Sequence, residues 1–288
     1  MTHAGWLAAA TFVLTTGAGA FFTGAILNAS GTTWGGPLRR VHEAVASALP
    51  VGALAFVVLA RDLHVRDFVA LAIVVVLEEW LRVSRSRAVA SASLPIASFA
   101  LALFANDAIC PRAWSYDSFG LYVLVMSFGG GFGVTTLVAT TMHERLALDR
   151  DHAAALGKLS LVACTVWAYV AFCTYLIVWI ADLPSEVGFF LERQRGAWNA
   201  VLVGIVVARF AIPFLFLVPH APKRHFWSLG ALAALVVLAH AVECVWLVAP
   251  GAAPEHAPVV LASIGLVALA VVAALVRFKR EHALHEAS

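Results

Sequence analysis

The sequence predicts an all-α fold, a polytopic transmembrane helix bundle of about nine spans. Of the 288 residues, 62% are hydrophobic and only 12% are charged, whereas a soluble domain has about 45–50% apolar and about 25% charged residues. Apolar runs of roughly 20 residues, enough for a helix to cross a bilayer, recur between charged segments. The near balance of 19 Lys and Arg with 17 Asp and Glu gives no basic excess that would indicate nucleic-acid binding.

Nine apolar runs predict the individual spans. The first is longer than the apolar core of a signal peptide and follows no Lys or Arg, so we expect it to be retained. The third is short and ends in Glu78-Glu79-Trp80, and the sixth is long enough to begin outside the hydrocarbon. The runs lie at about 6–28, 41–60, 67–83, 88–106, 116–141, 154–181, 197–218, 226–248 and 257–277.

Loop cations predict the orientation of these spans. Across nine alternating runs, thirteen Lys and Arg fall in the loops and tail on one side and five on the other, and Arg209 lies inside a span. Cytoplasmic loops carry the excess of Lys and Arg. The chain is therefore expected to have its N-terminus outside the cytoplasm and its C-terminus inside.

No cofactor ligation is expected within this chain. The four cysteines are scattered, with neither the C-x-x-C-H motif of c-type haem nor metal-ligand spacing. An internal b-type haem would need two axial histidines at matching depth, and only His240 of the eleven histidines lies clearly within a span.

Three ionisable residues within the spans call for a partner or a function, because such groups are costly in a bilayer. Arg209 precedes Pro213, which removes a helical N–H and predicts a kink. His240 and Glu243 share one face of the eighth span. Two interpretations stay open: a buried Arg209–Glu243 ion pair that fixes helix packing, or a proton-conducting group.

Other polar and aromatic residues have both a structural and a functional interpretation. Glu43, Glu78 and Glu79 are interfacial acids beside arginines, and they are also candidates for the mouth of a proton path. Tyr169 and Tyr175, with Trp167, are candidates for contact with a quinone ring, although aromatics at such spacing more often pack against neighbours. The run 129–133, which contains a G-x-x-x-G, predicts close helix packing rather than a phosphate loop.

Motifs in two stretches carry a resemblance to a known family. The first stretch runs from Gly17 to Phe22, through Trp34 and Arg39-Arg40-Val41-His42-Glu43, to Pro50. The second contains Leu156-Gly157-Lys158, Trp167-Ala168-Tyr169, Tyr175 to Trp179, Leu183-Pro184-Ser185-Glu186, Gly196-Ala197-Trp198, Pro213-Phe214, Lys223-Arg224, His240 and Val245 to Pro250. In order and spacing they resemble the ActF-type integral membrane subunit of alternative complex III, a bacterial quinol:cytochrome c oxidoreductase.

The resemblance implies an architecture and a setting. Family members have ten spans, arranged as two four-helix bundles with peripheral helices, and the family's first helix is absent here. It implies one membrane domain over 1–288, with bundles at about 1–110 and 111–250 and a peripheral span at 257–277, in the bacterial inner membrane. The N-terminus would then be periplasmic, in agreement with the loop cations.

The resemblance also implies partners and a function. Partner subunits would be an NrfD/PsrC-like membrane protein, an iron–sulfur protein and c-type cytochromes, which carry the iron–sulfur clusters and haem c of a complex that oxidises quinol. This chain would be a cofactor-free, non-redox subunit among lipids, supporting assembly and conducting protons, although the family bears a quinone-binding label. The alternatives are an NrfD-like subunit with its own quinol site and a secondary transporter.

The chain departs from the family pattern at positions that bear on a proton route. Ala155 replaces an acid, Thr174 a glutamine and Arg209 a histidine. Glu243 stands near the position of a family aspartate. The family pattern therefore does not establish a proton route here, and the role of each proton-path candidate is a separate prediction.

Overall fold

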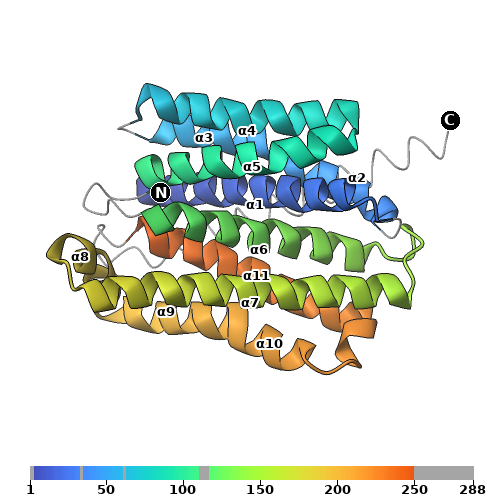
Figure 1. Cartoon of the computed structure of the whole chain (residues 1–288). Helices are drawn as coiled ribbons and strands as arrows, with labels where there is room; N and C mark the ends of the chain where they lie inside the picture. Colours follow the sequence, from blue (N-terminus) through green and yellow to red (C-terminus); the bar gives the residue numbers. More distant parts are fainter. Residues whose placement is uncertain (1–2, 33–34, 61–62, 110–116, 250–288) are drawn as a thin grey trace.

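The computed structural model describes residues 3–249 except 33–34, 61–62 and 110–116, so the predicted span at 257–277 lies outside the described residues. Within the described part, all regular elements are helical (Figure 1). The α-helices are α1 His3–Ser30, α2 Gly36–Ala46, α3 Leu49–Leu59, α4 Val65–Ser84, α5 Arg87–Phe104, α6 Asp117–Thr141, α7 Arg150–Ala181, α8 Pro184–Arg193, α9 Ala197–Val206, α10 Ile212–Leu217 and α11 Phe226–Val248. Two π-helical turns, η1 Ala105–Ile109 and η2 Val207–Ala211, and the 3₁₀ turn η3 Pro222–Arg224 complete the elements.

Seven described segments are long and apolar enough to cross a membrane, which confirms the polytopic helix bundle. They are α1, α2 with α3, α5 with η1, α6, α7, α9 to α10, and α11. The predicted third span corresponds to α4, which is not among the seven because charged residues at both ends dilute its apolar run. At 20 residues it still reaches about 30 Å, and it lies alongside α5 in the bundle (Figure 1).

The predicted second span is two helices rather than one. Helix α2 ends at Ala46 and α3 begins at Leu49, with Pro50 in the first turn of α3. Proline has no N–H, and its ring clashes with the carbonyl four residues before it, so a continuous helix is unfavourable here. The segment bends at 47–48 and continues across the bundle.

Helix α1 lies at the centre of the bundle, between α3 and α5 on one side and α6 and α11 on the other (Figure 1). A Cβ at Gly19 would lie 1.8 Å from the carbonyl oxygen of Ser127, and one at Gly131 would lie 2.2 Å from the backbone nitrogen of Ala20. The two backbones therefore touch, which only glycine permits. The prediction of close helix packing by the glycine run is confirmed at Gly131.

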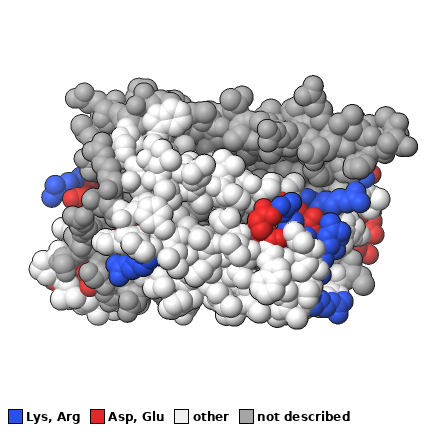
Figure 2. Space-filling view, turned by 90° about the horizontal axis from the view of Figure 1, so that it is seen from above, with Lys and Arg blue, Asp and Glu red and all other residues white. Residues whose placement is uncertain are grey.

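The described members of the two predicted sets of loop cations lie at opposite ends of the bundle. The end where α1, α4 and α6 finish and α2, α5, α7 and α11 start is called the basic end here (Figure 1). Seen from above, charged side chains gather toward the two ends, and the described surface between them shows no Lys, Arg, Asp or Glu in this view (Figure 2). The described cations at or near the basic end are Arg39, Arg40, Arg82, Arg85, Arg87, Arg145, Arg150, Lys158, Lys223 and Arg224.

Candidate functional site

Arg209 reaches the centre of the bundle from the irregular turn between α9 and α10. Pro213 cannot donate to the carbonyl of Arg209, and the helix widens into the π turn η2, where the N–H of Ile212 bonds to the carbonyl of Val207. The predicted kink is thus a π turn. It carries an arginine that is only 1% exposed.

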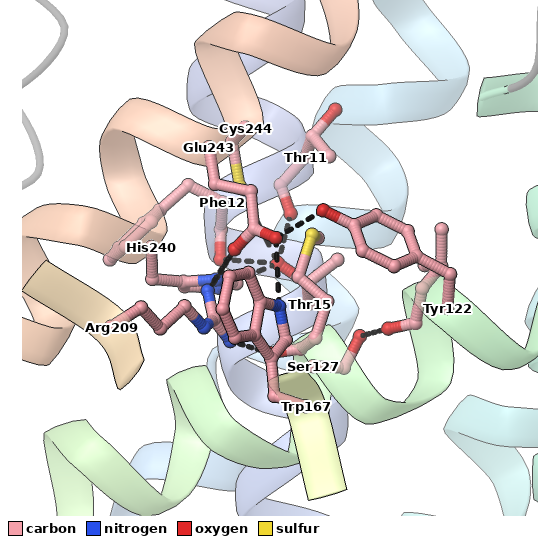
Figure 3. A network of polar contacts seen from close by, with 12 residues as sticks. Thr11, Phe12, Thr15, Tyr122, Ser127, Trp167, Arg209, His240, Glu243 and Cys244 are labelled. Carbon is pink, nitrogen blue, oxygen red and sulfur yellow. Dashed lines mark hydrogen bonds and ion pairs between the residues drawn. The ribbon is translucent and has the colours of Figure 1, made fainter. Parts of the chain in front are cut away.

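The guanidinium of Arg209 binds three helices at once (Figure 3). One terminal nitrogen forms an ion pair with Oε2 of Glu243 on α11, and the other donates to the carbonyl of Met126 on α6 at 2.6 Å. The guanidinium carbon also lies 5.1 Å from the centre of the Trp167 ring on α7, within range of a cation–π contact. The predicted Arg209–Glu243 pair is therefore present.

The carboxylate of Glu243 has donors on both oxygens. Oε1 accepts a hydrogen bond from Nε1 of Trp167 at 2.9 Å and a second from the hydroxyl of Tyr122. Two neutral donors and the guanidinium of Arg209 together stabilise the ionised form of this carboxylate. Glu243 is completely buried, so these contacts replace its hydration.

His240 is neutral, as its hydrogen bonds require. Arg209 cannot accept a hydrogen bond, so Nδ1 of His240 accepts from it at 3.0 Å. The Thr15 hydroxyl donates to the carbonyl of Thr11 at 2.7 Å, and it accepts from Nε2 of His240 at 3.1 Å. The ring therefore carries its single proton on Nε2 and completes the network toward α1.

Two glycines of the predicted motif make room for this network. A Cβ at Gly130 would lie 2.4 Å from the ring of His240, and one at Gly129 would lie 3.0 Å from a terminal nitrogen of Arg209. The glycine run therefore serves two purposes, since Gly131 lets α1 approach while Gly129 and Gly130 accommodate polar side chains.

Beside the network lies an aromatic cavity of about 680 Å³ between α7, α8, α9 and the end of α11. Tyr122 and Trp167 line it, so both donors to Glu243 also face the cavity. The predicted quinone-contact residues Tyr169 and Tyr175 line it too, and the hydroxyl of Tyr175 accepts from Nε2 of Gln194 at 3.3 Å. The structure thus brings the aromatic candidates together with the buried carboxylate.

The other predicted proton-path candidates, Glu43, Glu78 and Glu79, lie at the basic end. Glu43 pairs with Arg39 at 3.3 Å, and Glu79 pairs with Arg82. Glu78 is 3% exposed, and its Oε2 has no partner in the described part of the chain. No hydrogen bond among the described residues joins these acids to Arg209, His240 or Glu243, so the candidates form two separate clusters.

Sequence reasoning missed Tyr122, Thr15 and the donor role of Trp167. A lone tyrosine hydroxyl and a threonine within apolar runs were available signals, but neither shows which helix it faces.

Among the described residues, no group of three or more His, Cys, Asp and Glu side chains is placed to hold a metal ion.

No family model matches the chain, and no curated protein matches it.

Proposed function

We propose that this chain is an integral membrane subunit of a quinol-oxidising complex of the alternative complex III type, in a bacterial inner membrane. Haem c and iron–sulfur clusters would belong to partner subunits, and this chain would support their assembly on the membrane. Its N-terminus would lie in the periplasm and the basic end in the cytoplasm, in accordance with the distribution of loop cations.

The observation that carries the proposal is that the buried polar residues bind one another and connect several helices. Arg209, Glu243 and His240 bind one another and helices α1, α6 and α7. Such a network favours one arrangement of the helices over others, as suits a scaffold subunit. The ordered motifs around Trp167, Pro213 and His240 support the more specific assignment by resemblance.

Copurification tests this proposal. The chain would be tagged, extracted in a mild detergent and purified, and the sample examined for haem c absorbance and iron–sulfur electron paramagnetic resonance signals. Both should travel with this chain in constant ratio, and neither with an equally tagged, unrelated polytopic protein. A lone chain without either signal, or one active in solute uptake, would contradict the proposal.

Proton conduction is a further part of the proposal, and it rests on the contact between the network and the aromatic cavity. Tyr122 links the cavity to Glu243, which is the step a proton would take between them. Glu243→Gln removes the titratable group and keeps an acceptor for Trp167 and Tyr122. Because this change leaves Arg209 without its anion, we expect a less stable protein, so proton release in vesicles is compared per quinol oxidised by the complex that does assemble. This ratio should fall, and an unchanged ratio would leave only the scaffold function.

A quinol site within this chain is the second candidate, favoured by the cavity itself. Its apolar, aromatic wall with a few polar groups is typical of small-molecule sites. Ala171→Trp would fill the cavity, whereas Val166→Trp places the same ring on an exposed position of α7 outside it. Loss of copurifying quinone in the first variant alone would support this site, and equal quinone content in both would exclude it.

A further inference from the structure

A second cavity, of about 270 Å³, opens at the basic end, and it is called the basic-end cavity here. It lies where α1 ends and where α2 and α5 begin. The residues that line it are Gly24, Leu27, Asn28, Gly31, Thr32, Gly35, Gly36, Arg39, His42 and Arg87. Among the described residues, two arginines and no acid line this space. Glu43 and Glu78 line a smaller pocket that adjoins it at Arg39 and His42.

The two arginines have capacity left for a ligand. Arg39 uses only its Nε in the ion pair with Glu43. Arg87 makes no ion pair with a described residue, and its guanidinium lies against Gly31, where a Cβ would be 2.7 Å from the guanidinium carbon. Gly31 has φ +65°, which favours glycine. The turn after α1 thus leaves room for the cation at the cavity wall.

His42 supplies an independent observation that points to a ligand. It is 2% exposed, lines the cavity, and has no hydrogen-bond partner for either ring nitrogen in the described part of the chain. A buried polar group without a partner is unfavourable. An acceptor within the cavity would satisfy the N–H of this ring.

Two helix N-termini add backbone donors at the same place. Helix α2, of 11 residues, begins at Gly36, and helix α5, of 18 residues, begins at Arg87. Neither has a side chain that caps its first N–H groups. In α2 only the N–H of Gly36 is available, because Pro37 has none and that of Leu38 bonds to Gly35, so most of these donors come from α5. Free N–H groups and the positive end of the helix dipole both favour an anion.

We propose that the basic-end cavity binds a phosphate group through Arg39, Arg87 and His42. The site lies level with the ends of the spans, where phospholipid headgroups are found, and basic pockets between spanning helices are suited to anionic lipids. The phosphate would therefore come from a phospholipid headgroup, with free phosphate as the other source of the same chemistry.

Lipid retention tests the proposal in the purified, full-length protein. Nanodiscs would contain phosphatidylglycerol or a neutral glucosyl diacylglycerol with the same acyl chains, and retained lipid would be counted by native mass spectrometry. We expect Arg39→Gln and Arg87→Gln each to reduce phosphatidylglycerol retention about fivefold. The matched controls Arg40→Gln and Arg85→Gln remove equal charge at neighbouring positions outside the cavity and should retain it.

A second measurement distinguishes the sources of the phosphate. A thermal shift with inorganic phosphate alone, abolished by Arg87→Gln, would support the site with free phosphate as its ligand; no such shift together with selective lipid retention would support the headgroup. Equal losses in cavity and control variants, or equal retention of the glucosyl lipid, would overturn the proposal. Because Arg39 and Arg87 are exposed, their variants should fold normally.

Discussion

His240 and His42 are both buried histidines of this bundle, yet they differ in every polar contact. Both ring nitrogens of His240 are hydrogen-bonded, to Arg209 and Thr15, whereas those of His42 have no partner in the described part of the chain. The first therefore belongs to a network that the chain satisfies by itself. The second lines a cavity in which no described residue bonds to its ring, which is the pattern of a site awaiting a ligand.

The difference predicts that changes in the Arg209 network reduce stability, whereas changes around His42 reduce binding. Unfolding of the purified protein in detergent measures the first, and lipid retention measures the second. The variants below test this division, beginning with the largest expected effect.

Arg209→Met should destabilise the protein most, because it leaves the carboxylate of Glu243 buried without its cation. Removal of one partner from a buried ion pair costs about 3–5 kcal/mol. The double variant Arg209→Met with Glu243→Leu should recover much of this loss, since no charge then remains. Chemical unfolding would show both effects, with Arg40→Met, an exposed site, as the control. If Arg209→Met were as stable as the wild type, the Arg209 network would not contribute to stability.

Gly130→Ala should have the next largest effect. The new Cβ would lie 2.4 Å from the His240 ring, which Arg209 and Thr15 hold in place. Overpacking of this kind costs about 1–3 kcal/mol. Gly24→Ala is the counterpart beside His42, where the new contact would be 3.3 Å from a side chain that borders a cavity. Equal losses in thermal unfolding would contradict the difference between the two histidines.

Tyr122→Phe should cost about 1.5 kcal/mol, the lower end for a hydrogen bond to a charged group, because Glu243 loses one donor and keeps Arg209 and Trp167. His42→Phe exchanges two unpaired nitrogens for carbon, so unfolding should be unchanged or slightly harder. The same variant should release phosphatidylglycerol if the proposed site is right. A large loss of stability in His42→Phe would show that this ring has a structural partner.

The sequence predicted the bundle because long apolar runs enter a bilayer, where a helix satisfies all of its own backbone hydrogen bonds. It offered the Arg209–Glu243 pair as one of two interpretations, because a buried charge requires a partner or a function. The break at Ser47-Ala48 was less accessible, since an apolar run continues through it. Tyr122 and Thr15 could not be placed, because their contacts depend on how α1, α6 and α11 are rotated against one another. The role of Gly130 depends on the same rotations.

The smallest expected effect concerns Asp149, an exposed residue that caps α7 at the basic end. Hydrogen bonds from the backbone N–H and ring of His152 hold the pKa of this carboxyl below its usual range. A lowered pKa means that the ionised group stabilises the folded state above its unfolded pKa of about 3.9, and that this contribution is lost as the pH falls through the folded value. Asp149→Asn keeps the cap and does not titrate. The wild type should therefore unfold at a slightly higher temperature than this variant at pH 7, and the difference should shrink as the pH falls below about 4. A difference that stays constant over this range would mean that the charge of Asp149 contributes nothing, and that the basic end is stabilised by its buried contacts alone.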